Sequence, residues 1–544
     1  MTPVSQSVDC TVSIVTPSAS IEVEPALVRR FPDVLTPDAI EFLSALHAEF
    51  ALRREIELDN RRRRARALAA GAPLGVAQER AIREDTSWRV APPAPGLLDR
   101  RVEIVAPPTS RRAIDALGSG AKVWVADLED GTSPSWDNVF GGQAVLHDAV
   151  RGRLQHVEPD GRTYLVGPDA ATIVVRPRGW HLRQRGICFE GERASASLVD
   201  FGLYFFHCAQ AQIDRGQGPY FYLPKLESAT EARLWNDVLV FAQDLLGIPR
   251  GTARAAVLIE TLPAALEIEE ILYELREHSA GLAAGCWDYV FSIIKTVGAE
   301  PASIMPDRSV IATTVPFMRA YTELLVSTCH RRGAYAIGGT GTLVVSGDAD
   351  VNRRALDRVR DEKHREATDG FDGSWVADPG LVQACREQFD VLLGDRPSQL
   401  DRARRDVHVT AADLLDVAST PGAVTQSGVR LNVTVALRYV EAWLRGIGAV
   451  TIAGQVEDAA TAEIARAQLW QWVHHRARTH DGVAVTRAYV EEALDRACEQ
   501  LAHERAGDRS HRIADAREVI AEVVFGDTLV GFCTEYAYDR YLIG

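Results

Sequence analysis

The stretch Arg254-Ala-Ala-Val-Leu-Ile-Glu-Thr-Leu-Pro263, RAAVLIETLP in one-letter code, places a carboxylate directly after a run of strand-forming residues. The run is apolar and contains branched side chains, which is typical of a strand buried on both faces of a parallel sheet. Glu260 has two interpretations: either it helps to cap a helix over residues 262–275, or it is directed at a ligand.

Seven further short apolar runs have the same character, and amphipathic helical stretches such as residues 228–246 and 315–332 separate them. In chain order the eight runs are VEIVAP (102–107), KVWVADLED (122–130), TIVVRPRG (172–179), YFYLPK (220–225), AAVLIET (255–261), WDYVFS (287–292), AYAIGG (334–339) and GSWVADPG (373–380). Strands that alternate with helices form a parallel sheet, and eight such units predict a (β/α)8 barrel. A doubly wound sheet is the alternative, but it requires a glycine fingerprint after its first strand, which this chain lacks.

The sequence on either side of these runs is helical in character. Residues 36–43, TPDAIEFL, combine a cap residue with an acidic first turn, and residues 435–446, 459–475 and 486–502 have helical apolar spacing. We therefore expect an α/β protein, a TIM barrel with an N-terminal helical clasp and a C-terminal all-helical plug domain. The expected segments are a disordered leader (1–22), the clasp (23–100), the barrel (101–384) and the C-terminal helical domain (385–544).

The composition is that of a globular protein, with 46% hydrophobic and 25% charged residues among 544. A formal charge of −15 argues against nucleic acid or an anionic membrane as a partner, because both would repel the chain. The basic run NRRRRAR (60–66) is accordingly expected to be a solvated helix face.

Several features of the sequence bear on where the protein resides. The first 22 residues lack the basic start and apolar core of a signal peptide, and no apolar run is long enough to span a membrane. The eight cysteines include no CxxC pair. These features predict reduced thiols and a cytoplasmic location.

Polar residues close several of the apolar runs. Because the ends of barrel strands meet at one mouth, these side chains are expected to converge there. They are Asp127, Glu129 and Asp130 after the second run, Arg176 and Arg178 after the third, Lys225 after the fourth, Glu260 after the fifth, and Asp288 at the start of the sixth. Other interpretations stay open: Asp127 and Asp130 would also suit bonds to loop amides. Ion pairing would equally account for Arg176 and Lys225.

Strand-end carboxylates without nearby histidine or cysteine favour Mg²⁺ over zinc, because hard oxygen ligands suit the harder cation. A Mg²⁺ ion bound by two such carboxylates would leave positions for the oxygens of an anionic substrate and would polarise a carbonyl group. Such a site suits enolate and aldol chemistry on 2-oxo acids.

Seven stretches, taken in order, resemble malate synthase of the A type. They are KVWVADLEDGTSPSW (122–136), VRPRGWHL (175–182), PYFYLPK (219–225), VLIETLPA (257–264), WDYVFS (287–292), TCHRRGA (328–334) and VEDAATAE (456–463). The resemblance runs from about residue 30 to the C-terminus and implies the same three-part fold. It also implies an acyltransferase that condenses acetyl-CoA with glyoxylate and hydrolyses the thioester, giving malate and CoA with Mg²⁺ as cofactor.

The resemblance assigns roles by motif position. Glu260 and Asp288 match the Mg²⁺ ligands of the family, and Arg176 matches its catalytic arginine. Asp458 matches the base supplied by the C-terminal domain, which removes a proton from the acetyl methyl group while the arginine stabilises the enolate oxygen. From spacing alone, Asp458 is equally the N-cap of a helix over residues 459–475.

The chain departs from the family pattern on loops of the barrel mouth. Cys286 stands where the family has the arginine of Gly-Arg-Trp-Asp-Tyr, and Asp378 replaces a histidine. Residues 338–345 read GGTGTLVV in place of Gly-Gly-Met-Ala-Ala-Phe-Ile-Pro, and residues 128–131 read LEDG in place of Phe-Glu-Asp-Ser. Alternatives to the plain family reaction are the same chemistry on another acyl-CoA or 2-oxo acid, a malyl-CoA-type lyase, or a catalytically silent binding relative. The sequence leaves the oligomeric state open.

Overall fold

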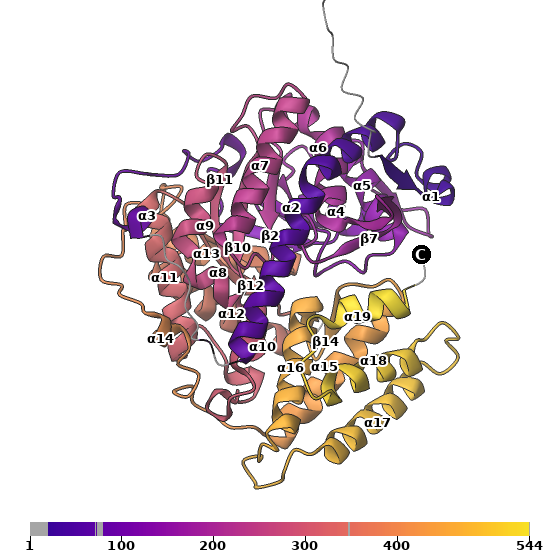
Figure 1. Ribbon diagram of the computed structural model, residues 1–544, viewed down its shortest axis with the longest axis vertical. Helices are drawn as coiled ribbons and strands as arrows, with labels where there is room; N and C mark the ends of the chain where they lie inside the picture. Colours follow the sequence, from indigo (N-terminus) through magenta and orange to yellow (C-terminus); the bar gives the residue numbers. More distant parts are fainter. Residues whose placement is uncertain (1–19, 71, 73–79, 346–348, 543–544) are drawn as a thin grey trace, which may run out of the picture.

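The computed structural model describes residues 20–70, 72, 80–345 and 349–542, so the predicted leader lies outside the described residues except for its last three. Eight parallel strands close into a barrel in the order β2-β3-β6-β9-β10-β11-β12-β13, with helices around them (Figure 1). The strands are β2 (Val102–Ala106), β3 (Val123–Asp127), β6 (Thr172–Arg176), β9 (Tyr220–Leu223), β10 (Arg254–Ile259), β11 (Ser279–Ala284), β12 (Ala336–Gly341) and β13 (Gly373–Val376). The predicted (β/α)8 barrel is confirmed.

The helices of this region follow the strands and cover the outside of the barrel. They are α4 (Ser110–Leu117), α5 (Trp136–Val150), α6 (Ala196–Ile213), α7 (Ala229–Leu245), α8 (Leu262–Leu266), α9 (Ile268–Glu274), α10 (Cys286–Val297), α11 (Pro316–Arg332), α12 (Ala349–Asp369) and α13 (Val382–Leu393). Short 3-10 turns are η1 (Pro95–Leu97), η2 (Pro301–Ser303), η3 (Arg308–Val310) and η4 (Pro379–Leu381).

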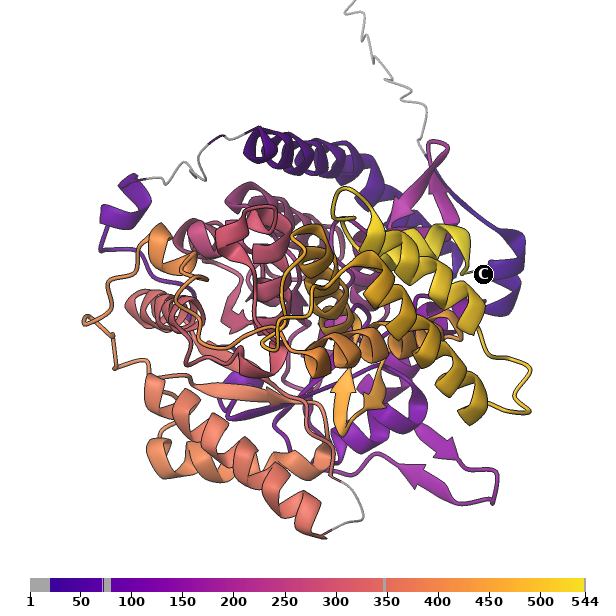
Figure 2. The same cartoon turned by 90° about the horizontal axis from the view of Figure 1, so that it is seen from below.

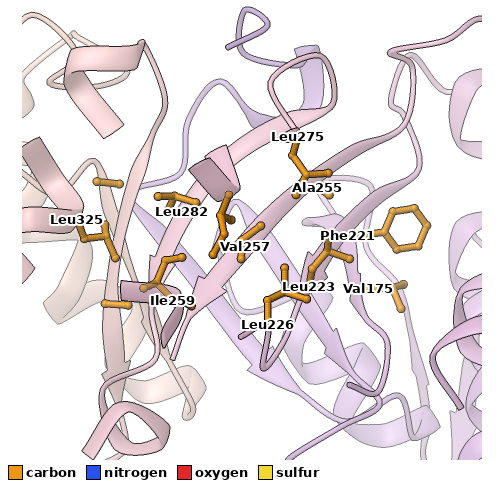
Figure 3. Packing of buried hydrophobic residues seen from close by; sticks show 14 of the residues in the cluster. Val175, Phe221, Leu223, Leu226, Ala255, Val257, Ile259, Leu275, Leu282 and Leu325 are labelled. Atoms are coloured by element: carbon orange, nitrogen blue, oxygen red, sulfur yellow. The ribbon is translucent and has the colours of Figure 1, made fainter. Parts of the chain in front are cut away.

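Strand β10 shows how the apolar pattern divides between the two faces of the barrel wall. Ala255, Val257 and Ile259 belong to the core between strands and helices, where Figure 3 shows them among the side chains of neighbouring elements. Ala256 and Leu258 belong instead to the core inside the barrel. Successive side chains of a strand point to opposite faces, so the next position in the inward series, Glu260, faces the barrel axis.

The sixth strand was predicted at the wrong place. Residues 287–292 lie in α10, and the strand is β11, which precedes them. Its sequence, SAGLAA, contains no β-branched or aromatic residue, so its strand signal is weak. The predicted helix over residues 262–275 is divided into α8 and α9, which meet at Glu267.

The N-terminal clasp is built on one long helix, α2 (Pro37–Ala69), which packs on α6 and α7 (Figure 1). The basic run on α2 is only partly a solvated face. Arg62 and Arg63 are exposed as predicted, but Arg61 forms an ion pair of 2.5 Å with Glu231 at the start of α7. The other elements of this region are α1 (Pro25–Arg30), α3 (Arg80–Glu84) and β1 (Ile21–Val23), which forms a sheet with β7 (Arg183–Phe189) and β8 (Glu192–Ser195) of the barrel region. The hairpin of β4 (Gln155–Val157) and β5 (Thr163–Leu165) is also part of the barrel region, between α5 and β6.

The C-terminal region is helical, as predicted, with one short hairpin that was not. Its elements are α14 (Ala411–Leu414), α15 (Gln426–Leu444), β14 (Val450–Ile452), β15 (Gln455–Glu457), α16 (Ala459–His474), α17 (Arg487–Glu504), α18 (Ile513–Phe525) and α19 (Cys533–Arg540). The helices α15 to α18 share a hydrophobic core of their own, and they lie together against the barrel (Figure 2). No helix among the described residues is long and apolar enough to cross a membrane.

Candidate metal and acid-base site

Three charged residues stand at the ends of barrel strands, and the strand alternation points each of them inward. Asp127 and Arg176 are paired in register as the last residues of β3 and β6, and Glu260 directly follows β10. The inward positions two residues earlier, Val125 and Val174, belong to the core inside the barrel. The apolar strand residues therefore fix the direction of the polar residues that end them.

All four residues singled out from the sequence line a single cavity at the barrel mouth. Arg176 and Glu260 come from strand ends, Asp288 from the first turn of α10, and Asp458 from the C-terminal region. Residues that are far apart in the sequence thus meet as predicted.

Asp130 completes a cluster of three carboxylates with Glu260 and Asp288. The three residues are buried, and a carboxylate oxygen from each lies within 4.8 Å of the others. Sequence reasoning named Asp130 at a strand end but did not assign it to the metal. The sequence feature that could have indicated this role is the position of Asp130, three residues after Asp127 at the end of β3 and therefore at the barrel mouth.

The cluster fits a divalent cation. Oδ1 of Asp288 is buried without a hydrogen-bond partner among the described residues. Burial raises the pKa of Glu260 to about 7, with further repulsion from Glu129 and Asp130 opposing the attraction of Lys225. Burial also raises the pKa of Asp288 well above its usual range, with repulsion from Asp130 and Glu260 adding to it. Carboxylates held together against their own repulsion are stabilised by a cation, and all-oxygen ligands suit Mg²⁺.

Glycine allows the carboxylates to approach. A Cβ atom on Gly285 would lie 2.5 Å from the Cβ atom of Glu260, so any larger residue would push the two strand ends apart. The residue between β11 and α10 therefore has to be glycine for Glu260 and Asp288 to converge.

Lys225 balances part of the negative charge of the cluster. Its Nζ lies 2.8 Å from Oδ1 of Asp130, 3.1 Å from Oε2 of Glu129 and 3.4 Å from Oδ1 of Asp288. Its backbone has a φ of 51°, a left-handed conformation that is unusual for lysine, and its N–H donates to Glu260 at 2.5 Å. The sequence predicted Lys225 as an ion-pair partner. The prediction is correct, and the lysine pairs with three carboxylates rather than one.

Arg176 is held in one orientation by two aspartates. Nε and Nη2 donate to the two carboxylate oxygens of Asp127 at 2.7 and 2.5 Å, and Nη1 lies 3.0 Å from Asp130. Burial alone would lower the pKa of Arg176, but Asp127 and Asp130 outweigh it and raise the pKa well above the usual range. Asp127 also accepts from the amides of Glu129 and Gly131, so the loop-amide interpretation is correct for this residue.

The N-cap interpretation of Asp458 is correct, and its role as the base stays a prediction. It caps α16, where its Oδ1 accepts from the N–H of Thr461 at 3.2 Å, and it lines the cavity. Among the described residues, no hydrogen bond reaches its Oδ2. Burial, together with repulsion from Asp130, raises the pKa of Asp458 to about 7, which suits a general base.

The structure also resolves the alternative for Glu260. The cap of the helix after β10 is Thr261, whose Oγ1 accepts from the N–H of Ala264 at 3.2 Å. Glu260 therefore does not cap that helix, and it remains directed at the cavity.

The positions that depart from the family pattern fall in different places. Cys286 and Thr340 line the cavity, and the Sγ of Cys286 lies 3.1 Å from where a Cβ on Gly339 would stand. Asp378 does not line that cavity; it caps η4 and accepts from the N–H of Gly380 at 2.8 Å.

A buried carboxylate cluster at the mouth of a (β/α)8 barrel defines the class of barrel enzymes that bind a divalent cation. Within that class, the family model "Malate synthase, TIM barrel domain" matches residues 172–417, and "Malate synthase, C-terminal" matches residues 423–541. The chain belongs to the malate synthase family.

Relatives of the chain match it over nearly its whole length. A malate synthase of Streptomyces clavuligerus is 50% identical over 96% of this chain and 99% of its own. One of Myxococcus xanthus is 47% identical over 94% of both chains, and malate synthase A of Escherichia coli is 40% identical over 93% of this chain and 95% of its own.

Proposed function

We propose that this protein is a malate synthase, an acyltransferase that condenses acetyl-CoA with glyoxylate and hydrolyses the thioester to give malate and CoA. The observation that carries the proposal is the convergence in one cavity of three buried carboxylates with Arg176 and Asp458. The full-length similarity to relatives named malate synthase supports the same reaction.

Asp458 acts as the base. Its Oδ1 is occupied by the N–H of Thr461, so Oδ2 is the oxygen that accepts a proton from the methyl group of the thioester. The helix cap fixes the carboxylate in position, which keeps the reacting oxygen aimed at the cavity.

Arg176 stabilises the enolate oxygen that develops when the proton leaves. A guanidinium fork stays charged throughout, and the bidentate bond to Asp127 prevents it from turning away. Asp127 is therefore a positioning residue for Arg176.

Asp130, Glu260 and Asp288 are the residues that would hold the metal. A Mg²⁺ ion bound there supplies positive charge that partly neutralises the carboxylate of the 2-oxo acid and makes its aldehyde carbon electrophilic. Lys225 limits the repulsion among the three carboxylates.

The test is CoA release by the purified protein, measured with a thiol reagent, from acetyl-CoA and glyoxylate with Mg²⁺. The expected result is release that requires all three components. Turnover only with a longer acyl-CoA or another 2-oxo acid would mean that the substrates are not acetyl-CoA and glyoxylate. A CoA ester as product would indicate a lyase. No release with any pair would refute the proposal.

We further propose a cytoplasmic location, supported by the seven described cysteines, all of which are free. Fractionation of the producing cells tests it: recovery with membranes or outside the cell would contradict it. The division into a clasp (23–100), a barrel (101–384) and a helical domain (385–544) is also a proposal, and limited proteolysis near residues 100 and 385 tests it.

A further inference from the structure

Helix α12 presents one partly cationic face to the cavity of the site. Arg358, Val359, Glu362, Arg365 and Glu366 all line it, and their spacing places them on one side of the helix. The carboxylates of this face already have a partner, because Nζ of the buried Lys363 lies 2.7 Å from Glu362 and 3.2 Å from Glu366. The arginines are the charges left to act on a ligand.

Arg358 and Arg365 are exposed, and among the described residues neither forms a hydrogen bond or an ion pair. Arg360, on the opposite side of the same helix, pairs instead with Asp357 at 3.2 Å and Glu387 at 3.7 Å. In a chain with a formal charge of −15, two unpaired arginines two helical turns apart at a cavity rim form a local anion-binding surface.

The cavity lining is charged at its buried end and at its exposed rim, and much of the lining between them is uncharged. The carboxylate cluster and Arg176 are buried, whereas the two arginines are at the exposed rim. Much of the remaining lining is uncharged and includes Ile311, Met318, Thr340, Leu343 and Gln455. The ligand that fits has a reactive carbonyl at one end, an uncharged middle and anionic groups at the far end.

We propose that Arg358 and Arg365 bind the phosphate groups of the acyl-CoA and thereby set the preference for this thioester over carriers that lack phosphates. The inference rests on the proposed function and adds two substrate-binding residues to it. Arginine suits the task because its planar fork bonds two phosphate oxygens at once and it remains charged at any physiological pH.

The test compares acetyl-CoA with S-acetyl-pantetheine, which has the same thioester but lacks the nucleotide phosphates. The variants are R358A, R365A and the double variant, with R360A as the matched control on the same helix. The preference in kcat/KM for acetyl-CoA is expected to fall about tenfold for each arginine removed and to be unchanged in R360A. R358K should recover part of the loss, because it keeps the charge but not the fork.

Calorimetric binding of CoA provides a readout that does not need turnover. The affinity of the wild type should fall as salt is raised, and the double variant should bind more weakly and with less salt dependence. An unchanged preference and an unchanged CoA affinity in the double variant would overturn the proposal. If the wild type released neither CoA from acetyl-CoA nor pantetheine from S-acetyl-pantetheine, the proposed function would fail instead, and CoA affinity alone would decide the role of the arginines.

Discussion

At the scale of single residues, the site joins structural and chemical roles in the same side chains. Asp458 caps a helix and lines the cavity of the carboxylate cluster, and Asp127 closes a loop and holds Arg176. Sequence spacing predicts the structural roles, because caps and loop bonds are local. Sequence spacing cannot show whether such a residue also has a chemical role, because that role depends on which side chains from other elements line the same cavity.

Replacing Asp458 with asparagine should lower kcat by about 10²–10⁴-fold, the usual contribution of a positioned base. The amide keeps the cap on α16, so the fold and CoA affinity are expected to persist. Exchange of the acetyl methyl protons with deuterated solvent measures the step directly. Exchange at the wild-type rate in D458N would show that another residue is the base.

The pH dependence of the rate provides a second measure of Asp458. Burial and repulsion from Asp130 raise the pKa of Asp458 to about 7, and only the ionised carboxylate accepts a proton. The value of kcat/KM is therefore expected to fall about tenfold per pH unit below the pKa and to level off above it. A flat profile between pH 5 and pH 8 would contradict this assignment.

Asp288 is the residue whose replacement best reports on the metal. Wild-type protein should be stabilised by Mg²⁺, by about 2.7 kcal/mol at a concentration a hundredfold above its Kd. D288N should lose most of this stabilisation. It should be no less stable than the wild type without metal, because the amide removes a carboxylate whose ionisation burial opposes. Thermal melts with and without Mg²⁺ measure both effects, and D361N, an exposed aspartate on α12, is the control.

At the scale of elements, strands with branched or aromatic residues were predictable and the weakest strand was not. β10 and β3 show strong apolar patterns, whereas the SAGLAA sequence of β11 resembles a loop or a helix. The error moved a strand onto α10, yet Asp288 still reached the mouth, because the first turn of a helix after a barrel strand lies at the same end. Asp130 and Lys225 were harder, since their contacts depend on loop paths that no periodicity describes.

A buried histidine links helix α2 to the end of β8. The ring of His47 has Nδ1 2.8 Å from the carbonyl oxygen of Leu43, and its Nε2 accepts from the N–H of Ser195 at 3.2 Å. Protonation would place two N–H groups against each other at Ser195. Burial lowers the pKa of His47 from 6.5 to about 4, with Arg54 lowering it further and the bond to Leu43 opposing.

Stability should therefore fall as the pH falls from 6.5 towards 4. In that window the unfolded chain binds a proton at His47 that the folded chain does not, so acid favours unfolding. H47Q should show a shallower decline in Tm over this range than the wild type. The control is H511Q at an exposed histidine, which should show the same decline as the wild type. Equal slopes for H47Q and the wild type would show that His47 does not control the acid sensitivity.

At the scale of the whole molecule, the docking of the C-terminal helices on the barrel mouth brings Asp458 to the cavity of the carboxylate cluster. The N–H of Ala459 donates to the backbone of Asp130 at 3.2 Å, and Ser133 donates to Trp443 at 2.7 Å. The carboxylate cluster belongs to the barrel, and Asp458, the proposed base, comes from the other side of this contact. Docking therefore sets the distance between Asp458 and the carboxylate cluster.

Gly448 is a point of close contact between the C-terminal region and the barrel mouth. A Cβ atom there would lie 2.5 Å from the backbone of Gly131, Thr132 and Ser133, none of which is a flexible side chain that could move aside. G448A should therefore shift the C-terminal helices and displace Asp458, lowering kcat more than tenfold while the Kd for Mg²⁺ stays near that of the wild type. The control is G167A, where a Cβ meets nothing within 4 Å. Equal losses of kcat and of Mg²⁺ affinity would mean that the barrel mouth itself had been distorted, and that docking does not separate the base from the metal site.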